Sequence, residues 1–332
     1  MPKASVIVPA FNAVSTIPET LASLQRQSFE DMEIIVVDDG STDETADLVR
    51  SWQSDPRIRL VQQANRGLAG ARNTGIAAAR GIYLGLCDAD DVWQPDKLMR
   101  HVRHLDARPH VGVSYSGSYL MDQNGRPISR TQTPRLRGIT AAHVFKRNPV
   151  GNGSASVLRR RMLEAMAFRP KQEFVRDWYF DETFRQSEDI EFWLRITLRS
   201  DWGFEGVPGL LTGYRINTNG LSADTDRQFK SWCRMVDKLR PLDPYFFKRH
   251  EPAARAYQYR YLARRAVSGR DGARAFELMR KSLSSSLRPV LEEPIKTIST
   301  LLAAGIFAVA GPKVSSVLPG VTHAGPRTER SD

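Results

Sequence analysis

Short apolar runs alternate with helical patterns through the first hundred residues, and this alternation restricts the possible folds more than any other feature. The runs are SVIVP, IIVV, IRLVQ and IYLGL, separated by helix-like segments near residues 15 to 27, from about Thr42, and near 67 to 79. Such an order is typical of βαβ units on a parallel sheet. The first two runs lack polar alternation, so we predict central strands that helices cover on both faces. The predicted class is α/β, with a mixed, mainly parallel sheet.

The C-terminal third is chemically different from the rest. Residues 226 to 332 hold 20 Lys and Arg against 10 Asp and Glu, which leaves only +1 of the net charge of +11 for residues 1 to 225. After Asp226 the pattern becomes helical, and AYQYRYLARRAVSGRDGARAFELMRKSL predicts two helices around a turn. We therefore expect a domain over 1–225 and a basic helical appendage over 226–332, with a disordered end after Gly320.

Three roles fit the basic appendage: a nucleic-acid partner, an anionic membrane surface, or a solvated helical face. Arg264 and Arg265 follow tyrosines at 257, 259 and 261, an interleaving that can stack bases. The stretch TISTLLAAGIFAVAGP, residues 297–312, carries no charge. It is shorter than the roughly 20 residues that span a bilayer, so it predicts an interfacial or a buried helix.

Cysteine content and the N-terminus suggest a reducing compartment. Cys87 and Cys233 are the only cysteines, and their spacing matches neither a zinc site nor a disulfide framework. The first residues lack the charged region, apolar stretch and small-residue cleavage site of an export signal. We therefore expect a cytoplasmic protein.

Two predicted helices begin just after acidic strand ends. Ser41 and Glu44 match a capping box, and Pro95 stands where a first helical turn tolerates it. In open α/β folds the carboxyl edge of the sheet binds ligands. The acidic residues expected at that edge are Asp38, Asp39, Asp88 and Asp90.

The segment LCDADDVWQPDKL places three carboxylates side by side after an apolar run. Asp88 and Asp90 form a D-x-D pair, and a spacing of two in a turn can direct both toward one ion. Oxygen ligands of this kind suit Mg²⁺ or Mn²⁺, which also accept oxygens of a substrate diphosphate. The alternative is that the carboxylates only cap a helix, which is the role expected for Asp91.

Five motifs in order, PAFN, VVDDGSTD, GLAGARNTG, DADD and SEDIEFWLRI, resemble the family 2 glycosyltransferases of the GT-A fold from residue 3 to about 225. The resemblance implies an inverting transfer of a sugar from a nucleotide sugar to an acceptor hydroxyl, in synthesis of bacterial surface polysaccharide or glycolipid. Asp88 and Asp90 would then bind the metal, with Asp88 also at the donor. The Q-x-x-R-W signature of processive members is missing, so we expect one sugar per encounter.

The resemblance also assigns the nucleotide site. Asp39 would accept the N3 hydrogen of uracil, Phe11 would lie against the base, and Pro9 would supply backbone contacts. A carboxylate facing a donor edge favours uracil or thymine over adenine, whereas the alternative for Asp39 is helix capping. Arg72 would lie near the nucleotide, where a guanidinium can pair with anionic oxygens. Its alternative is a solvent-exposed helix residue.

The last motifs assign the chemistry on the acceptor side. Asp189 would be the general base that accepts the hydroxyl proton, and Glu188 would cap and position. Arg215, in GYRINTNGLS, would reach the diphosphate or form a salt bridge within the fold. The family often has His where this chain has Asn217, which leaves the role of that position open.

Other functions compete with this interpretation. A nucleic-acid-binding protein would use the basic appendage, but the acidic edge would repel a phosphate backbone, so no nucleic-acid partner is expected. A nucleotidyltransferase would share the carboxylate and metal chemistry but release pyrophosphate. A glycoside hydrolase would use two carboxylates without metal or nucleotide. The segment from about 112 to 180 is expected to select the sugar and the acceptor.

Overall fold

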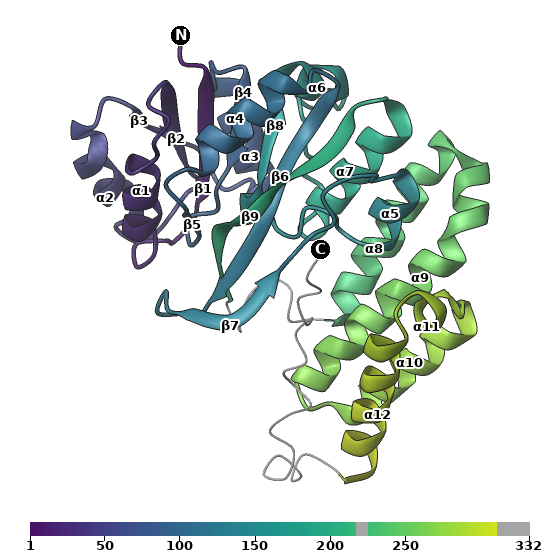
Figure 1. The fold of residues 1–332 in the computed structure, drawn as a ribbon. Coiled ribbons are helices and arrows are strands. Elements are labelled where there is room, and N and C mark those ends of the chain that lie inside the picture. Colours follow the sequence, from purple (N-terminus) through teal and green to yellow (C-terminus); the bar gives the residue numbers. More distant parts are fainter. Residues whose placement is uncertain (217–224, 311–332) are drawn as a thin grey trace, which may run out of the picture. The chain divides into compact units, whose positions relative to one another are not determined.

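A computed structural model describes residues 1–216 and 225–310, and the chain divides into two compact units (Figure 1). The sheet unit contains Met1–Val144 and Asn148–Asn217. The helical unit contains Phe145–Arg147 and Thr218–Asp332. The boundary between the two units therefore lies near residue 217, and a short piece around residue 146 also belongs to the helical unit.

The described part of the sheet unit holds one nine-stranded mixed sheet, in the order β3-β2-β1-β4-β8-β6-β9-β5, with β7 paired to β6. Its strands are β1 (Ala4–Ala10), β2 (Met32–Asp38), β3 (Ile58–Gln62), β4 (Tyr83–Leu86), β5 (Val92–Trp93), β6 (Val111–Met121), β7 (Pro127–Gln132), β8 (Ser156–Arg159) and β9 (Gly203–Arg215). Strands β3, β2, β1 and β4 run parallel, and the β6–β9 pair is parallel as well. The pairs β4–β8, β6–β8, β6–β7 and β5–β9 are antiparallel.

The helices of the sheet unit cover both faces of its central strands. They are α1 (Ile17–Gln25), α2 (Thr45–Ser51), α3 (Gly67–Ala78), α4 (Lys97–Ala107), α5 (Ala141–Lys146, whose last two residues belong to the helical unit), α6 (Arg160–Met166) and α7 (Glu188–Arg199). Val6 and Val8 join one core cluster with Leu21 of α1 and Leu98 of α4. Ile7 points the other way and packs so closely on α3 that a Cβ at Gly75 would lie 2.3 Å from it. The two-sided burial predicted for β1 and β2 is confirmed.

Three local predictions need correction. Helix α2 begins at Thr45, where Asp43 accepts the Thr45 N–H at 3.0 Å, while Ser41 instead accepts the Asn12 N–H at 3.0 Å. Helix α4 begins at Lys97, so Pro95 stands before the helix. In both places a turn joins the strand to the helix. Polar side chains in such turns bond to nearby backbone groups, and this bonding takes the place of the cap that the sequence predicts.

The third correction concerns GRPISRTQTPRLRG, which the sequence predicts as a polar loop. Residues Pro127–Gln132 form β7 and pair antiparallel with β6. Most of β7 is exposed, so it lacks the apolar alternation by which a strand is recognised. Backbone pairing with β6, and not side-chain burial, makes this segment a strand.

The helical unit contains α8 (Thr225–Leu239), α9 (Pro244–Ser268), α10 (Gly272–Ser285), α11 (Arg288–Glu292) and α12 (Pro294–Ala310) among its described residues. Leu262, Leu278 and Ala304 belong to a core that α9, α10 and α12 share. The predicted pair of helices around a turn is confirmed as α9 and α10. None of the helices in the described ranges is long and apolar enough to span a bilayer.

The tyrosines expected to interleave with arginines do not form a base-stacking surface. Tyr257 is buried and donates its hydroxyl to Glu292 at 2.6 Å. Tyr259 stacks on Phe229 with ring centroids 4.5 Å apart. Two of the three rings therefore pack inside the helical unit, which removes the observation that favoured a nucleic-acid partner.

Lys97, the first residue of α4, is buried against the sheet. Lys97 is fully buried, and its ammonium contacts the Ala155 carbonyl at 3.1 Å, the Ser116 hydroxyl at 3.3 Å and the His101 ring at 3.4 Å. Burial lowers the pKa of Lys97 to about 7, against the attraction of Cys87 and Asp91. The buried ammonium therefore loses its proton far more easily than a lysine in water.

The lowered pKa of Lys97 predicts that the free energy of unfolding depends on pH. Between pH 7 and 10 the unfolded chain binds the Lys97 proton and the folded chain does not, so stability should rise by about 1 kcal/mol per pH unit. Lys97→Met should remove that part of the slope, and exposed Lys171→Met should retain it. Urea unfolding at several pH values measures both. An unchanged slope in Lys97→Met would contradict the prediction.

Candidate active site

The acidic residues predicted for the carboxyl edge of the sheet lie there together. Strand β1 stands between β2 and β4, so the ends of these three strands are neighbours. The Asp39 N–H donates to the Ala10 carbonyl at 2.8 Å, and the Cys87 N–H donates to the Ile7 carbonyl at 2.9 Å. The segments that follow β2 and β4 are thereby held on either side of the end of β1.

The D-x-D pair lies in the turn after β4. Asp88 is partly exposed, and one of its oxygens accepts from Arg72 Nη2 at 2.9 Å. Among the described residues, the backbone of Asp90 itself supplies a hydrogen bond to its carboxylate, and no side chain does. Burial raises the pKa of Asp90 to about 6, the charge of Asp88 adds to this effect, and Arg215 opposes it. Two partly buried carboxylates here repel each other, and positive charge at this point would stabilise both.

Asp91 does not cap a helix as predicted. Its side chain is fully buried, and one oxygen accepts the backbone N–H of Arg215 at 2.9 Å. Strand β5 lies between Asp91 and α4, so the carboxylate is too early in the chain to reach the helix start. Burial and the charges of Asp90 and Asp88 raise its pKa well above the ordinary value. Asp91 therefore fixes the turn to the end of β9.

The carboxylate oxygens at this turn are suitable ligands for a divalent cation. Asp90 and the second oxygen of Asp88 offer hard oxygen ligands, as Mg²⁺ and Mn²⁺ prefer. Within 1–216 and 225–310, no three His, Cys, Asp or Glu side chains are grouped so that they could hold a metal together. The protein would thus supply two carboxylates and leave the other positions to substrate oxygens and water.

Arg72 connects the D-x-D turn to α7. Its side chain is only 2% exposed, and Nη1 donates to Glu188 Oε1 at 3.0 Å while Nη2 donates to Asp88. Burial alone would lower the pKa of Arg72, but the charges of Asp88 and Glu188 hold it above its usual range. A solvent-exposed Arg72 is therefore wrong. The guanidinium joins two acidic motifs that stand about a hundred residues apart in the sequence.

Glu188 and Asp189 occupy the first turn of α7. Ser187, just before the helix, has a left-handed backbone with φ of 64°. Burial raises the pKa of Glu188 to about 7, with Asp189 adding to it and Arg72 opposing. Burial also raises the pKa of Asp189, against the charge of Arg72. Asp189 is the more exposed of the two, and it accepts from Asn148 Nδ2 at 2.8 Å.

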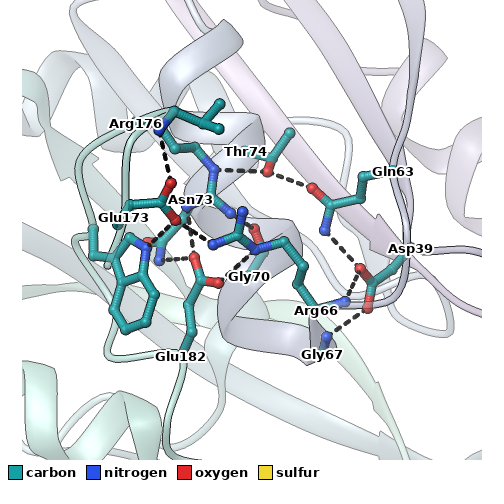
Figure 2. A network of polar contacts seen from close by, with 12 residues as sticks. Asp39, Gln63, Arg66, Gly67, Gly70, Asn73, Thr74, Glu173, Arg176 and Glu182 are labelled. Carbon is teal, nitrogen blue, oxygen red and sulfur yellow. Dashed lines mark hydrogen bonds and ion pairs between the residues drawn. The ribbon is translucent and has the colours of Figure 1, made fainter. Parts of the chain in front are cut away.

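Asp39 caps a different helix from the one considered in the sequence. Its two oxygens accept the backbone N–H groups of Arg66 and Gly67, both at 2.8 Å, at the start of α3 (Figure 2). Gln63 Nε2 donates to the same carboxylate at 2.6 Å. A carboxylate has about four acceptor sites, so roughly one remains for another donor.

Asp39 belongs to a polar network that links α3 to the segment before α7 (Figure 2). Arg66 pairs with Glu173 and Glu182, and Arg176 pairs with Glu182 at 2.6 Å. Asn73 accepts the Tyr179 and Phe180 N–H groups and donates to the Phe180 carbonyl. This network fixes the segment that leads into α7, and thereby the position of Asp189.

The loop after β1 completes the edge. Phe11 is 51% exposed and directly follows the buried residues Pro9 and Ala10. Asn12 Oδ1 accepts the Thr42 N–H at 2.8 Å, which ties this loop to the one after β2. An exposed aromatic ring therefore lies beside the carboxyl edge.

Arg215 has partners within the fold. Its side chain donates to the Asp90 carbonyl at 2.8 Å and to the Gln123 carbonyl at 3.0 Å, and it pairs with Glu19. These bonds correspond to the salt-bridge alternative and hold the backbone of the D-x-D turn. The contact with a diphosphate stays a prediction. Asn217 lies outside the described residues.

Comparison with known proteins finds a family match in the first half of the chain. Residues 5–166 match the family described as Glycosyl transferase family 2. This part of the chain is similar to that family. An uncharacterized glycosyltransferase of Nostoc sp., alr2836, is 36% identical over 172 residues, which cover 49% of this chain and only 52% of that relative. The succinoglycan biosynthesis protein ExoO of Rhizobium meliloti is 27% identical over 350 residues, covering 100% of this chain and 94% of ExoO.

Solved structures share the fold of this chain. TarS 1-349 of S. aureus, in complex with UDP-GlcNAc, aligns with a TM-score of 0.57 and 18% identity over 93% of this chain and 92% of TarS 1-349. The mannosyltransferase PcManGT of Pyrobaculum calidifontis, in complex with GDP-Man and Mn²⁺, aligns with a TM-score of 0.56 and 21% identity over 93% of this chain and 86% of that one. The predicted GT-A fold is confirmed.

Some residues of the candidate site were not predicted from the sequence. Ser154 accepts the Asp88 N–H at 2.8 Å, and Asn148 bonds to Asp189. Gly153 lies so close to Arg72 that an added Cβ would fall 2.4 Å from Nη2. The run NPVGNGSAS contains all three and carries the only usable signal, a cluster of small and turn-forming residues before a strand.

Proposed function

We propose that this protein moves one hexose from a nucleotide sugar, with UDP as the nucleotide, to an acceptor hydroxyl, with inversion at the anomeric carbon. One observation carries the proposal: Arg72 bonds at once to Asp88 of the D-x-D turn and to Glu188, the neighbour of Asp189. The groups proposed for the leaving diphosphate and for the attacking hydroxyl are therefore parts of one site. A single displacement needs both together.

On the donor side, Asp88 and Asp90 would hold Mn²⁺ or Mg²⁺. A bound cation would supply positive charge to the departing diphosphate. Arg72 holds the Asp88 carboxylate in position, and Arg215 and Asp91 hold the turn in place. The Mn²⁺ in the complex of the Pyrobaculum mannosyltransferase supports a cation in this fold.

On the acceptor side, Asp189 would take the proton from the acceptor hydroxyl as its oxygen attacks. Its raised pKa makes it a stronger base than an aspartate in water, which favours proton transfer near neutral pH. Asn148 and the Ile190 N–H each bond to one of its oxygens and orient it. No protein nucleophile is needed, because the hydroxyl itself attacks.

The nucleotide would lie between the loops after β1 and β2. Phe11 offers an exposed ring for the base, Pro9 precedes it at the strand end, and Asp39 keeps about one acceptor site for the N3 hydrogen of uracil. The UDP-GlcNAc complex of TarS supports this choice of nucleotide. Arg72 is screened by its two carboxylate partners, so we assign it to positioning at the donor site.

The biological role we propose is synthesis of bacterial surface polysaccharide or glycolipid. ExoO, a succinoglycan biosynthesis protein that aligns over the whole of this chain, supports this role. The acceptor would be a glycan or a lipid-linked sugar. The protein would be cytoplasmic and peripheral to the inner face of the membrane, where such acceptors are reached.

A panel of nucleotides and donors tests the proposal. Calorimetry with UDP and GDP, with and without Mn²⁺, should give UDP binding that strengthens with Mn²⁺ and exceeds GDP binding at least about tenfold. Incubation with UDP-sugars and Mn²⁺ should release UDP. Release of pyrophosphate from a nucleoside triphosphate and a sugar phosphate would favour a nucleotidyltransferase, and cleavage of a glycan without nucleotide would favour a hydrolase.

A further inference from the structure

Helix α12 exposes several of its large apolar residues although two of its alanines are buried. Ile295, Leu302 and Val309 are 79%, 61% and 91% exposed, whereas Ala303 and Ala304 are at most 4% exposed. A helix that packs only against the core of its own domain normally buries its large apolar side chains. The exposed side chains therefore contribute nothing to the described core of the helical unit.

These exposed residues form one continuous face. At 3.6 residues per turn, the five large side chains fall within about 80° of the helix circumference. We call this the α12 face: Ile295, Ile298, Leu302, Ile306 and Val309. Leu287 and Leu291, just before it in the chain, are also exposed. Single exposed apolar residues are ordinary, but a continuous stripe is typical of a binding surface.

The opposite side of α12 is packed tightly, which fixes the orientation of the α12 face. Gly272 approaches α12 so closely that a Cβ there would fall 2.2 Å from the Phe307 carbonyl carbon. Arg260 Nη1 donates to the Thr297 hydroxyl at 2.7 Å. Helix α12 therefore cannot rotate its apolar stripe into the core without losing these contacts.

Surplus positive charge lies at the N-terminal end of the α12 face. Five cations share two carboxylates there: Lys146 and Arg288 pair with Glu292, and Arg147, Arg260 and Lys296 pair with Glu293. The cluster thus carries a net charge of +3. Burial and then repulsion from Arg147, Arg264 and Arg260 lower the pKa of Lys296. An anion at this point would relieve that repulsion.

We propose that the α12 face lies in the headgroup region of an anionic membrane, with the exposed cations of the cluster, Arg147, Arg288 and Lys296, against lipid phosphates. An apolar stripe beside basic residues is the arrangement by which helices lie in a bilayer interface. An apolar protein partner alone would leave the surplus charge without a counterpart. The inference rests on the peripheral attachment proposed above and names the surface that makes it.

Vesicle sedimentation of the full chain tests the inference. Vesicles of phosphatidylcholine with phosphatidylglycerol should bind the protein, and binding should fall with salt and with removal of phosphatidylglycerol. Leu302→Glu and Ile306→Glu together should lower binding about tenfold or more. Lys296→Gln should lower it about fivefold. Tyr245→Glu, at an exposed residue of α9 in the same unit, should bind like the unchanged protein.

Each contrary result has a distinct meaning. Binding that persists in the Leu302 and Ile306 variant would overturn the α12 face as the docking surface, although attachment itself would stand. No binding of the unchanged protein, with a dimer in light scattering that the same variant dissociates, would assign the face to a second copy and overturn the proposal. Neither readout uses sugar transfer, so failure here is distinguishable from failure of the proposed reaction.

Discussion

Asp189→Asn should lower the turnover of bound donor by about 10²- to 10⁴-fold and leave donor affinity almost unchanged. The amide keeps the size of the carboxylate and its oxygen can still accept one of the two hydrogen bonds, but it cannot accept the proton of an acceptor hydroxyl. Asp189 lies in the first turn of α7 and is the most exposed of the three acidic residues there, so an acceptor can reach it. Steady-state kinetics with UDP-sugar, together with calorimetric UDP affinity, separates the two effects.

Two variants serve as controls for this result. Asp201→Asn changes an exposed aspartate just beyond the other end of α7 and should leave turnover intact. Glu188→Gln removes the negative charge that pairs with Arg72 and should disturb donor binding as well as turnover. If Asp189→Asn abolishes UDP affinity while bound donor turns over normally, Asp189 is a binding group and not the base.

Asp90→Asn should abolish the Mn²⁺ dependence of UDP binding and lower turnover by about 10³-fold. It removes one of two carboxylates at the D-x-D turn, and a metal contributes several kcal/mol at a developing charge, where 1.36 kcal/mol is tenfold in rate. No side chain among the described residues donates to that carboxylate, so the substitution breaks no hydrogen bond between side chains. Calorimetric titration of UDP at several Mn²⁺ concentrations measures the effect.

The matched control is Asp96→Asn, which makes the same change in charge at an exposed aspartate just before α4. It should bind UDP with unchanged Mn²⁺ dependence. The metal assignment would fail if Asp90→Asn retained the full dependence of UDP affinity on Mn²⁺. A thermal unfolding curve for each variant separates loss of the site from loss of the fold.

Local sequence patterns predicted the parallel half of the sheet well. Runs such as VIV and IIVV are apolar without interruption because both faces of β1 and β2 are covered, and that burial is recorded in every residue of the run. Strand β7 shows the opposite case. Its residues are mostly exposed, so nothing in their composition marks the pairing with β6 that makes them a strand.

The motif residues of the site could be named from the sequence, but their partners could not. Asp39, Asp88 and Asp189 stand in recognisable local patterns. Their contacts come from elsewhere: Arg66 and Gly67 for Asp39, and Ser154 for Asp88. Those partners are 27 to 66 positions away, and no periodicity relates residues at such separations.

The sequence by itself determined the α/β class, the acidic edge of the sheet and the basic character of the appendage, because strand burial, helix period and net charge are properties of short segments. Only the tertiary structure decided that Arg72 is buried between Asp88 and Glu188, and that α12 turns five of its large apolar side chains outward. Both depend on which surfaces meet after the chain has folded. The composition of an uncharged stretch does not say which of its faces packs, and the close approach of Gly272 to α12 fixes that choice.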